Sequence, residues 1–457
     1  MPPPNITGKL HIGHSLFLTI QDSLARYYRK SGYDTNWIAG LDHAGIATHE
    51  KIIERLPNSY SNDDYDLKAN EIKNEHGSKI TEQIKKMGAS CDWNNLHYTL
   101  NDNFKTAAFE ALKKLNEENL IYEDSGNIYI KMKGMANKLL KNIKNNKFII
   151  NDITQLNKLI YTLENIEDWC ISRQIRWGLE MPLYFKDNKM LISKNPESNY
   201  LHCGYTFDTW FTSSLYPLAI LNWNTEDDSL YKEYYPTQII ETGYDILFPW
   251  CARMLMMCEF LTGEYPFKEI YLHGICRDKY GRKMSKSLGN GIDPLDIIEK
   301  HGTDALRFAL INKSKGKDMK IDEEDFQNAS KFINKIYQSF RFINMHLEKN
   351  NIDPLINENG DYKEKLNNLK EEFINAMEKR DFINISTKLQ YSYKHHFCDK
   401  WIEENKKEIF AGNEEIIKHG LYILLYYMNI MHCFIPFISE YIYEHFGYDN
   451  INYKQYN

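Results

Sequence analysis

The hydrophobic pattern of the sequence changes after residue 322, and this change limits the possible folds more than any other feature. Before it, short apolar runs such as TQIIE (237–241) and EIYLHGI (269–275) alternate with segments of helical spacing. From 323 to 445 nearly the whole sequence has helical spacing. Strands alternating with helices predict a parallel α/β sheet, and a long helical segment predicts a bundle. We therefore expect an α/β domain followed by an all-α domain.

The same spacing predicts individual elements. We expect a short buried strand at 35–41, a helix from about Pro294, and helices over 14–30, 65–88, 102–119 and 246–261. The Lys- and Asn-rich stretch 133–160 predicts only a weak helix and a short strand around Phe148–Ile150. Pro2, Pro3 and Pro4 have no N–H to give to a sheet, so the N-terminal segment is expected to be a strand exit.

Composition narrows the class of protein. The chain has 457 residues and a net charge of −7, which does not favour a nucleic-acid binder, although local basic patches could still hold an RNA. The 8 cysteines include no CxxC pair, so neither a disulfide framework nor a zinc site is indicated. There is no candidate membrane span and no signal or transit peptide, and a cytoplasmic location is expected.

The first segment with chemical content is His11-Ile12-Gly13-His14, at the predicted start of a helix. Its two histidines are three residues apart and therefore lie on one face of the first turn. A helix N-terminus suits a polyphosphate because it offers free N–H groups and the positive end of the helix dipole. Gly13 leaves space for a nucleobase to lie close. The alternative is that these histidines only satisfy the start of the helix.

The second segment is Lys283-Met284-Ser285-Lys286-Ser287, between Gly281 and Gly289. The glycines allow a loop to move, and its two lysines and hydroxyls can supply charge and donors to phosphate oxygens as charge develops. The alternative is a solvated basic turn, which is the usual role of a short Lys/Ser run.

Taken together and in this order, the two segments resemble the paired H-I-G-H and K-M-S-K-S signatures of the class I aminoacyl-tRNA synthetases. In that family the two signatures flank ATP and stabilise the transition state in which an amino-acid carboxylate attacks the α-phosphate. Other stretches resemble the valyl members in particular, and the resemblance covers nearly the whole chain apart from 125–160 and the last dozen residues. These stretches include PPPNITGKLHIGH (2–14), AGLDHAGIAT (39–48), ENIEDWCISRQIRWG (164–178), DTWFTSSLYP (208–217) and ETGYDILFPW (241–250).

The resemblance assigns roles residue by residue. It implies that the catalytic residues are His11, His14, Lys283 and Lys286. The residues expected to bind ATP are His11, Gly13, His14, Gly243, Asp245, His273, Met284 and Lys286. For Asp245 a role as a helix N-cap is also compatible with the pattern.

The amino-acid site follows from the same resemblance. Asn5 and Asp42 should meet the α-ammonium group, and Pro3, Trp210, Ile246 and Trp250 should line an apolar slot for a branched side chain. For the two tryptophans, core packing is the alternative. Arg173 and Gln174 could serve only as scaffold. Arg176, Leu179 and Pro249 depart from the valyl pattern and put the local pocket geometry in question.

A large insertion, in which valyl enzymes hydrolyse mischarged threonine, has no counterpart in this sequence. About three dozen residues join Glu123 to Tyr161, too few for such a domain, so we expect no editing site. The expected domains are two halves of a Rossmann-like catalytic domain (1–124 and 161–262) around an insertion remnant (125–160), a stem-contact region (263–312) and an anticodon-binding helical domain (313–457).

The strand expected before the Pro-rich segment is also missing. Either the true start lies upstream, which we favour, or the sheet lacks a strand. The C-terminal basic coiled-coil arm of larger valyl enzymes is likewise not present in this sequence.

The resemblance implies a cytoplasmic, monomeric enzyme that joins valine to tRNA(Val) with ATP and Mg²⁺, and without a metal site of its own. Two other functions stay open: a related synthetase of isoleucyl-like specificity, and a catalytically inactive tRNA-binding paralogue. The intact histidines and lysines of the two signatures argue against the inactive paralogue.

Overall fold

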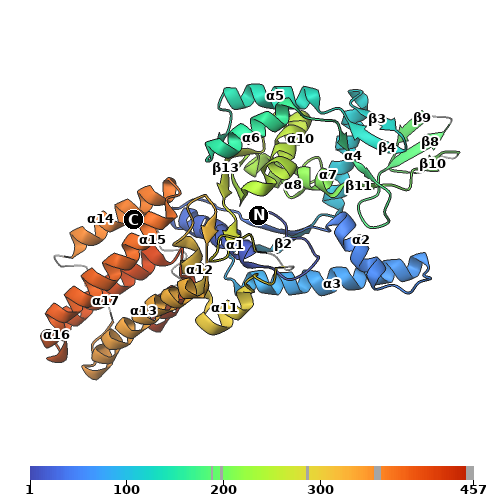
Figure 1. The fold of residues 1–457 in the computed structure, drawn as a ribbon. Helices are drawn as coiled ribbons and strands as arrows, with labels where there is room; N and C mark the ends of the chain where they lie inside the picture. Colours follow the sequence, from blue (N-terminus) through green and yellow to red (C-terminus); the bar gives the residue numbers. More distant parts are fainter. Residues whose placement is uncertain (187–188, 196–198, 285–287, 355–361, 449–457) are drawn as a thin grey trace. The chain divides into compact units, whose positions relative to one another are not determined.

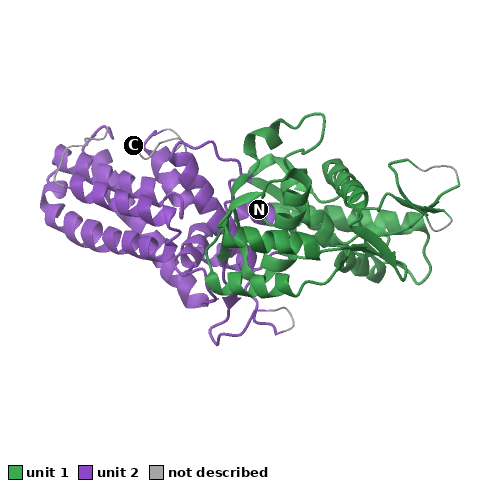
Figure 2. Ribbon diagram, turned by 90° about the horizontal axis from the view of Figure 1, so that it is seen from above, with its two compact units in different colours: residues 1–9, 38–81, 92–272 green, residues 10–37, 82–91, 273–457 purple. Residues whose placement is uncertain are grey.

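The computed structural model describes residues 1–186, 189–195, 199–284, 288–354 and 362–448. The chain forms two compact units (Figure 2). Unit 1 contains residues 1–9, 38–81 and 92–272, and unit 2 contains residues 10–37, 82–91 and 273–457. The two units are therefore not consecutive in sequence, and helix α3 (Asn62–Lys86) contributes to both of them.

Unit 1 contains the parallel strand pairs that the alternating pattern predicts. Strand β1 (Ile38–Leu41) runs parallel to β2 (Asp92–Tyr98), and β13 (Phe267–His273) runs parallel to β5 (Ile149–Ile150). Strand β12 (Thr237–Gly243) completes a three-stranded sheet in the order β12-β13-β5. The α/β class expected for this part of the chain is confirmed.

Helices of unit 1 form an extensive apolar core. Along α4 (Asp102–Glu117) the apolar residues recur every three or four positions, so they share one buried face: Phe104, Ala107, Ala108, Ala111, Leu112 and Leu115. The other helices of this unit are α2 (Gly45–Glu54), α5 (Lys133–Lys144), α6 (Ile153–Glu164), α7 (Thr209–Ser214), α8 (Tyr216–Ala219), α9 (Ser229–Tyr234) and α10 (Arg253–Thr262). Helix α6 goes beyond the weak helix and short strand expected for 133–160.

Short antiparallel strands form the rest of unit 1. Strands β3 (Ile121–Asp124), β4 (Asn127–Ile130) and β6 (Trp169–Cys170) make one sheet, and β8 (Leu183–Lys186), β9 (Lys189–Ile192) and β10 (Leu201–His202) make another. Strand β7 (Ser172–Arg173) pairs with β11 (Thr206–Phe207). Residues 125–160 are thus occupied by β4, α5, β5 and most of α6, which are ordinary elements of the unit.

The prediction of one continuous helix over 246–261 is wrong in its first half. A 3-10 turn (Tyr244–Ile246) and a π-helical turn (Leu247–Ala252) precede α10. Pro249 lies within the π turn. Proline has no N–H for an α-helical hydrogen bond, and its ring crowds the carbonyl group four residues earlier, so this stretch departs from regular α geometry.

The described residues of unit 2 are mainly helical, with one short parallel strand pair, β14 (Cys276–Arg277) with β15 (Met319–Lys320). Figure 1 shows helices α13 (Glu323–Lys349), α14 (Lys363–Glu378), α15 (Phe382–Tyr391) and α17 (Glu414–Met431) of this unit packed as a bundle. The helices of this unit are α1 (Ile12–Lys30), α11 (Pro294–His301), α12 (Thr303–Ile311), α13 (Glu323–Lys349), α14 (Lys363–Glu378), α15 (Phe382–Tyr391), α16 (Glu403–Phe410), α17 (Glu414–Met431) and α18 (Pro436–His445). The expected all-α domain is confirmed.

Local sequence explains where these helices begin. Asp322 caps α13 by accepting a hydrogen bond from the Glu324 N–H at 3.0 Å, and Asp293 caps α11 through the Leu295 N–H at 2.9 Å. A π-helical stretch (Ser392–Ile402) joins α15 to α16 without a break.

Candidate active site

The first turn of α1 fixes the orientation of the two signature histidines. His11 is the N-cap residue, and its Nδ1 accepts a hydrogen bond from the Gly13 N–H at 3.1 Å. The His14 Nδ1 accepts one from the His11 N–H at 3.1 Å, and the two ring centroids are 3.9 Å apart. Because both Nδ1 atoms act as acceptors, the proton of each neutral ring lies on Nε2, which can donate to an anionic oxygen.

Gly13 packs closely against the His11 ring, which the sequence did not reveal. A Cβ atom at this position would lie 2.9 Å from Cε1 and 3.1 Å from Nδ1 of His11. Any side chain would therefore push the His11 ring out of its capping position. Close packing against His11 is thus a structural reason for the glycine, alongside the space for a nucleobase that the sequence predicts.

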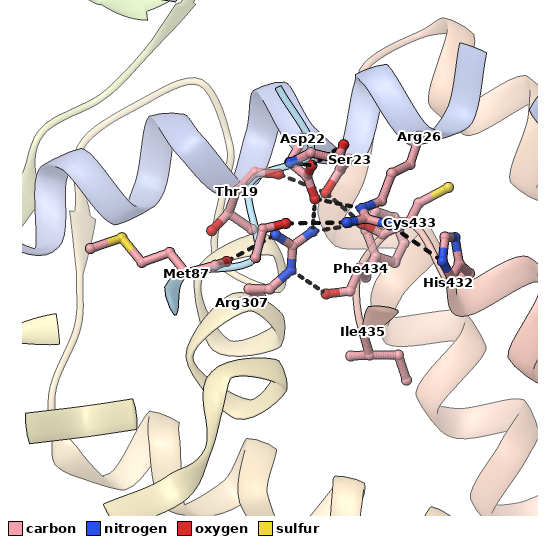
Figure 3. A network of polar contacts seen from close by, with 12 residues as sticks. Thr19, Asp22, Ser23, Arg26, Met87, Arg307, His432, Cys433, Phe434 and Ile435 are labelled. Atoms are coloured by element: carbon pink, nitrogen blue, oxygen red, sulfur yellow. Dashed lines mark hydrogen bonds and ion pairs between the residues drawn. The ribbon is translucent and has the colours of Figure 1, made fainter. Parts of the chain in front are cut away.

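A buried charge network holds α1 within unit 2 (Figure 3). The Asp22 carboxylate, which is fully buried, lies 2.6 Å from the Arg307 guanidinium and 2.7 Å from that of Arg26. Arg307 also donates to the carbonyl oxygens of Cys433 and Phe434 at 3.0 and 3.1 Å. Burial alone raises the pKa of Asp22, but the two guanidinium groups outweigh it and bring the pKa to about 2.

The segment Lys283–Ser287, called the lysine loop below, belongs to unit 2, and the structure describes the residues on both sides of it. Lys283 is exposed and forms an antiparallel bridge with Arg277, and Met284 is half-buried. Lys286, together with Ser285 and Ser287, lies outside the described residues. His273 is buried at the end of β13.

Unit 1 brings together Asn5 and Asp42, the two residues expected to meet the α-ammonium group. The Asp42 N–H donates to the Pro4 carbonyl oxygen at 2.9 Å, and Asn5 forms a parallel bridge with Asp42. Asp42 is 4% exposed. Its carboxylate accepts hydrogen bonds from the Ala44 N–H at 2.6 Å and the Ser213 hydroxyl at 2.7 Å.

Asp42 is thus a buried carboxylate with neutral protein partners. Within the described part of the chain, no lysine, arginine or histidine forms an ion pair with it. Burying a charge is costly unless it is paired, so this site is favourable for a cationic group of a ligand.

Trp250 and Asp42 are linked through one residue. The Trp250 indole N–H donates to the Ser213 carbonyl oxygen at 3.0 Å, and the Ser213 hydroxyl donates to Asp42. Trp250 is 2% exposed, so most of its surface packs in the core, as the alternative interpretation expected. Sequence reasoning did not single out Ser213, although its place in DTWFTSS, three residues after Trp210, was a usable signal.

Trp210 is half-buried and lines a cavity of about 550 Å³ together with Trp169, Phe248 and Arg253. Ile246 is half-buried, and Gly243 ends β12.

Asp245 is exposed in the 3-10 turn, where Gly243 and not Asp245 is the N-cap residue. The alternative role of Asp245 as a helix N-cap is therefore wrong.

Arg176, which departs from the valyl pattern, and the possible scaffold residues Arg173 and Gln174 all have structural partners. The Arg176 guanidinium forms two hydrogen bonds with the Asp66 carboxylate, at 2.9 and 2.6 Å. Arg173 pairs with Asp208 at 3.0 Å, and Gln174 donates to Asn127 at 3.0 Å, so both side chains have scaffold contacts. Among the described residues, no group of three or more His, Cys, Asp or Glu side chains is arranged to hold a metal ion.

Comparison with known protein families decides what kind of enzyme this is. The model of the tRNA synthetases class I (I, L, M and V) matches residues 1–129, 125–204 and 188–322. The chain belongs to this family. The model of the anticodon-binding domain of tRNA ligases matches residues 362–456. The chain is accordingly an aminoacyl-tRNA ligase, an enzyme class that acts on an amino acid, ATP and tRNA.

Individual relatives agree with this assignment. The valine–tRNA ligase of Thermotoga maritima is 28% identical over an alignment that covers 97% of this chain and 75% of that protein. The valine–tRNA ligase of Borreliella burgdorferi is 27% identical, with 98% of this chain and 75% of that protein covered.

Solved structures show the same fold. The agnB2 LeuRS of Agrobacterium radiobacter K84, in a ternary complex with tRNA and LeuAMS, matches with a TM-score of 0.80 at 14% identity, over 99% of this chain and 85% of that one. Mycobacterium tuberculosis methionyl-tRNA synthetase in complex with methionyl-adenylate matches with a TM-score of 0.77 at 16% identity, over 96% of this chain and 91% of that one.

In the part of the chain that the structure covers, no helix is long and apolar enough to cross a membrane.

Proposed function

We propose that this chain is a valine–tRNA ligase. It converts valine and ATP to valyl-adenylate and pyrophosphate, and then transfers the valyl group to the terminal ribose of tRNA(Val). The observation that carries the choice of amino acid is the alignment of 97% of the chain with a relative named valine–tRNA ligase. The structure supports it with a buried carboxylate, Asp42, that has no cationic partner among the described residues.

In this proposal Asp42 and Asn5 bind the α-ammonium group of valine. The hydrogen bonds from Ala44 and Ser213 hold the carboxylate in place before the ligand arrives, so little reorganisation is needed on binding. Trp210, Ile246, Trp250 and Pro3 form the walls of the side-chain slot. Trp250 suits a rigid wall because it is buried and bonded to Ser213.

The phosphates of ATP contact the N-terminus of α1 and the lysine loop. His11 and His14 donate from Nε2 to phosphate oxygens, and the N–H groups and dipole of the α1 N-terminus add positive potential. Lys283 and Lys286 neutralise the charge that develops on the phosphates in the transition state. Gly243, Asp245, His273 and Met284 face the ribose and the adenine.

The reaction needs no covalent intermediate on the enzyme. The side chains orient the valine carboxylate towards the α-phosphate and stabilise the charge that develops there. Mg²⁺ enters with ATP and neutralises polyphosphate charge. We further propose that the enzyme acts as a monomer in the cytoplasm.

Binding of the tRNA is assigned to the C-terminal part of the chain. The stem-contact region (263–312) meets the acceptor side, and the helices of 313–457 bind the anticodon arm. The match of the anticodon-binding model to 362–456 supports this division.

We also propose that the chain has no editing site for threonine. The alignment with the Thermotoga maritima relative spans 652 positions whereas this chain has 457 residues, so at least 195 aligned positions have no residue of this chain. The family model matches in separate segments that meet near residues 125–129 and 188–204. Residues 125–160 supply only β4, α5, β5 and most of α6.

Exchange of labelled pyrophosphate into ATP, with one amino acid at a time, tests the proposal. Valine should support exchange better than isoleucine by roughly 10- to 200-fold, the discrimination expected for one methylene group. A preference for isoleucine would replace the valyl assignment with the isoleucyl alternative. Absence of exchange with every amino acid, together with retained tRNA binding, would favour the inactive paralogue.

A further inference from the structure

A tight hairpin precedes the lysine loop. The Asp278 N–H donates to the Arg282 carbonyl oxygen at 3.0 Å, and the Gly281 N–H donates to the Asp278 carbonyl oxygen at 2.8 Å. Gly281 has a φ of +84°, which favours glycine. The turn places Lys283 opposite Arg277, where the two form an antiparallel bridge.

The Asp278 carboxylate holds both flanks of the loop. One oxygen accepts hydrogen bonds from the N–H groups of Tyr280 and Arg282 at 3.0 and 2.9 Å. The other accepts from the Arg282 Nε at 2.8 Å and from the Asn290 amide at 3.0 Å. Arg282 immediately precedes Lys283, and Asn290 is the fourth residue after Lys286. One side chain therefore connects the beginning and the end of the lysine-bearing segment.

Other contacts strengthen this connection. The Asn290 amide also donates to the Lys283 carbonyl oxygen at 3.3 Å. The hydrogen bond from Asn290 and the contacts with Arg282 lower the pKa of Asp278 to about 2, so the carboxylate is ionised throughout the physiological range. Charge-assisted hydrogen bonds of this kind are stronger than those between neutral groups.

We propose that Asp278 is a positioning residue for Lys283, the first lysine of the loop. By joining Arg282 to Asn290, whose amide also donates to the Lys283 carbonyl oxygen, it fixes the spacing between the two described flanks and the backbone position of Lys283. Asp278 has no role in substrate contact in this proposal. Its kinetic consequence rests on the proposed function, because the lysines act there on the phosphates of ATP.

The variant Asp278→Asn tests this role with little change of shape. The amide keeps one acceptor oxygen but loses the charge and the acceptor for Asn290. We expect kcat for valine-dependent exchange to fall about 10- to 100-fold, as when catalytic groups are misplaced by about 1 Å, while KM for valine stays near the wild-type value. The double variant D278N/N290D restores a donor and an acceptor between the two positions and should recover part of the lost kcat.

Asp322→Asn is the matched control. Asp322 accepts a hydrogen bond from the Glu324 N–H at the start of α13, in the same unit, and its own N–H donates to Asp325, so these contacts lie away from the loop. Its kcat should match the wild type. A similar fall of kcat in D278N and D322N would overturn the proposal, since it would show a general loss of structure. Failure of the double variant to recover any kcat would also contradict the proposed tie between the two flanks.

Limited trypsin digestion gives a readout that does not depend on activity. Cleavage after Lys283, identified by mass spectrometry, should be faster in D278N than in the wild type and unchanged in D322N. The reason is that the contacts of Asp278 with Arg282 and Asn290, called the clamp here, resist the extended conformation that the protease requires. Equal cleavage in all three proteins would overturn the proposal. If the wild type shows no valine-dependent exchange, the proposed function fails, and the digestion still tests the clamp.

Discussion

The rings of His11 and His14 owe their orientation to backbone N–H groups of the same turn, with Nδ1 as the acceptor in both. This arrangement uses the histidines as capping residues and leaves Nε2 to donate. The structural and functional interpretations of the H-I-G-H segment are therefore compatible, because capping fixes the tautomer that phosphate binding needs.

Asp42 provides a test at a single residue. The variant Asp42→Asn keeps the shape of the side chain but removes the charge that would pair with the α-ammonium group. Hydrogen bonds to charged groups contribute about 1.5–3 kcal/mol, so KM for valine in the exchange reaction should rise roughly 10- to 100-fold with little change in KM for ATP.

Asp66→Asn serves as the control for this variant. Asp66 lies in the same unit, but its ion pair with Arg176 is solvent-exposed and should contribute little. An unchanged KM for valine in D42N, or an equal rise in both variants, would contradict the assigned role of Asp42.

Residues that belong to a local motif could be singled out from the sequence, whereas the residues that contact them in the fold could not. The spacing of the histidines and of the lysines is local in sequence and identified both segments. Ser213 and Asp278 were missed because their importance comes from contacts: Ser213 reaches Asp42 from 171 positions away, and Asp278 reaches Asn290 across 12. The packing of Gly13 against the His11 ring was likewise not predictable, because it depends on the orientation of that ring.

At the level of elements, hydrophobic periodicity predicted most helices well. The predicted 102–119 corresponds to α4 (Asp102–Glu117), and the predicted start near Pro294 corresponds to α11. The failure at 246–261 has a specific cause, since periodicity registers apolar spacing and does not register the missing N–H of Pro249. The short antiparallel strands around β8 and β9 have too few residues to give a clear period-2 signal.

A buried carboxylate at a helix start gives an element-level prediction about pH. Asp304 on α12 accepts hydrogen bonds from the N–H groups of Phe437 and Ile438, in the first turn of α18, at 3.2 and 2.7 Å. Burial raises the pKa of Asp304 to about 6, against the lowering effects of these bonds and of Arg307. The folded protein therefore binds this proton more tightly than the unfolded chain, whose aspartate has a pKa near 3.8.

It follows that deprotonation of Asp304 lowers the free energy of unfolding as pH rises from about 4 to about 6, by roughly 3 kcal/mol in total. The variant Asp304→Asn cannot ionise and should lack this component. Between pH 7 and pH 5 the melting temperature of the wild type should rise by a few degrees relative to that of D304N. Scanning fluorimetry of both proteins measures this, and a constant difference between them across the range would contradict the assignment.

At the level of the whole molecule, the order of domains in the sequence and the compact units of the structure differ. An α/β part followed by an all-α part was predictable from the change of pattern after residue 322. It was not predictable that α1, near the start of the chain, belongs to unit 2 together with residues 273–457. It depends on long-range contacts such as the pair between Asp22 and Arg307, which are 285 positions apart.

The small size of the insertion predicts how the enzyme handles threonine. Valine and threonine are similar in shape, and a valyl pocket alone is known to separate them by only about 10²-fold, a general figure that was not obtained from this chain. We expect the purified protein to form Thr-tRNA(Val) slowly and to leave it intact. Incubation of Thr-tRNA(Val) with the protein should give the same rate of deacylation as buffer alone, and rapid enzymatic deacylation would disprove the absence of an editing site.

The central claim is that this chain activates valine, and valine-dependent exchange of pyrophosphate into ATP by the purified full chain measures that step most directly. We predict clear exchange with valine for the wild type, and loss of exchange with little loss of tRNA binding for the variant Lys286→Ala. Exchange that does not depend on valine, or that is unchanged in the Lys286→Ala variant, would contradict the account.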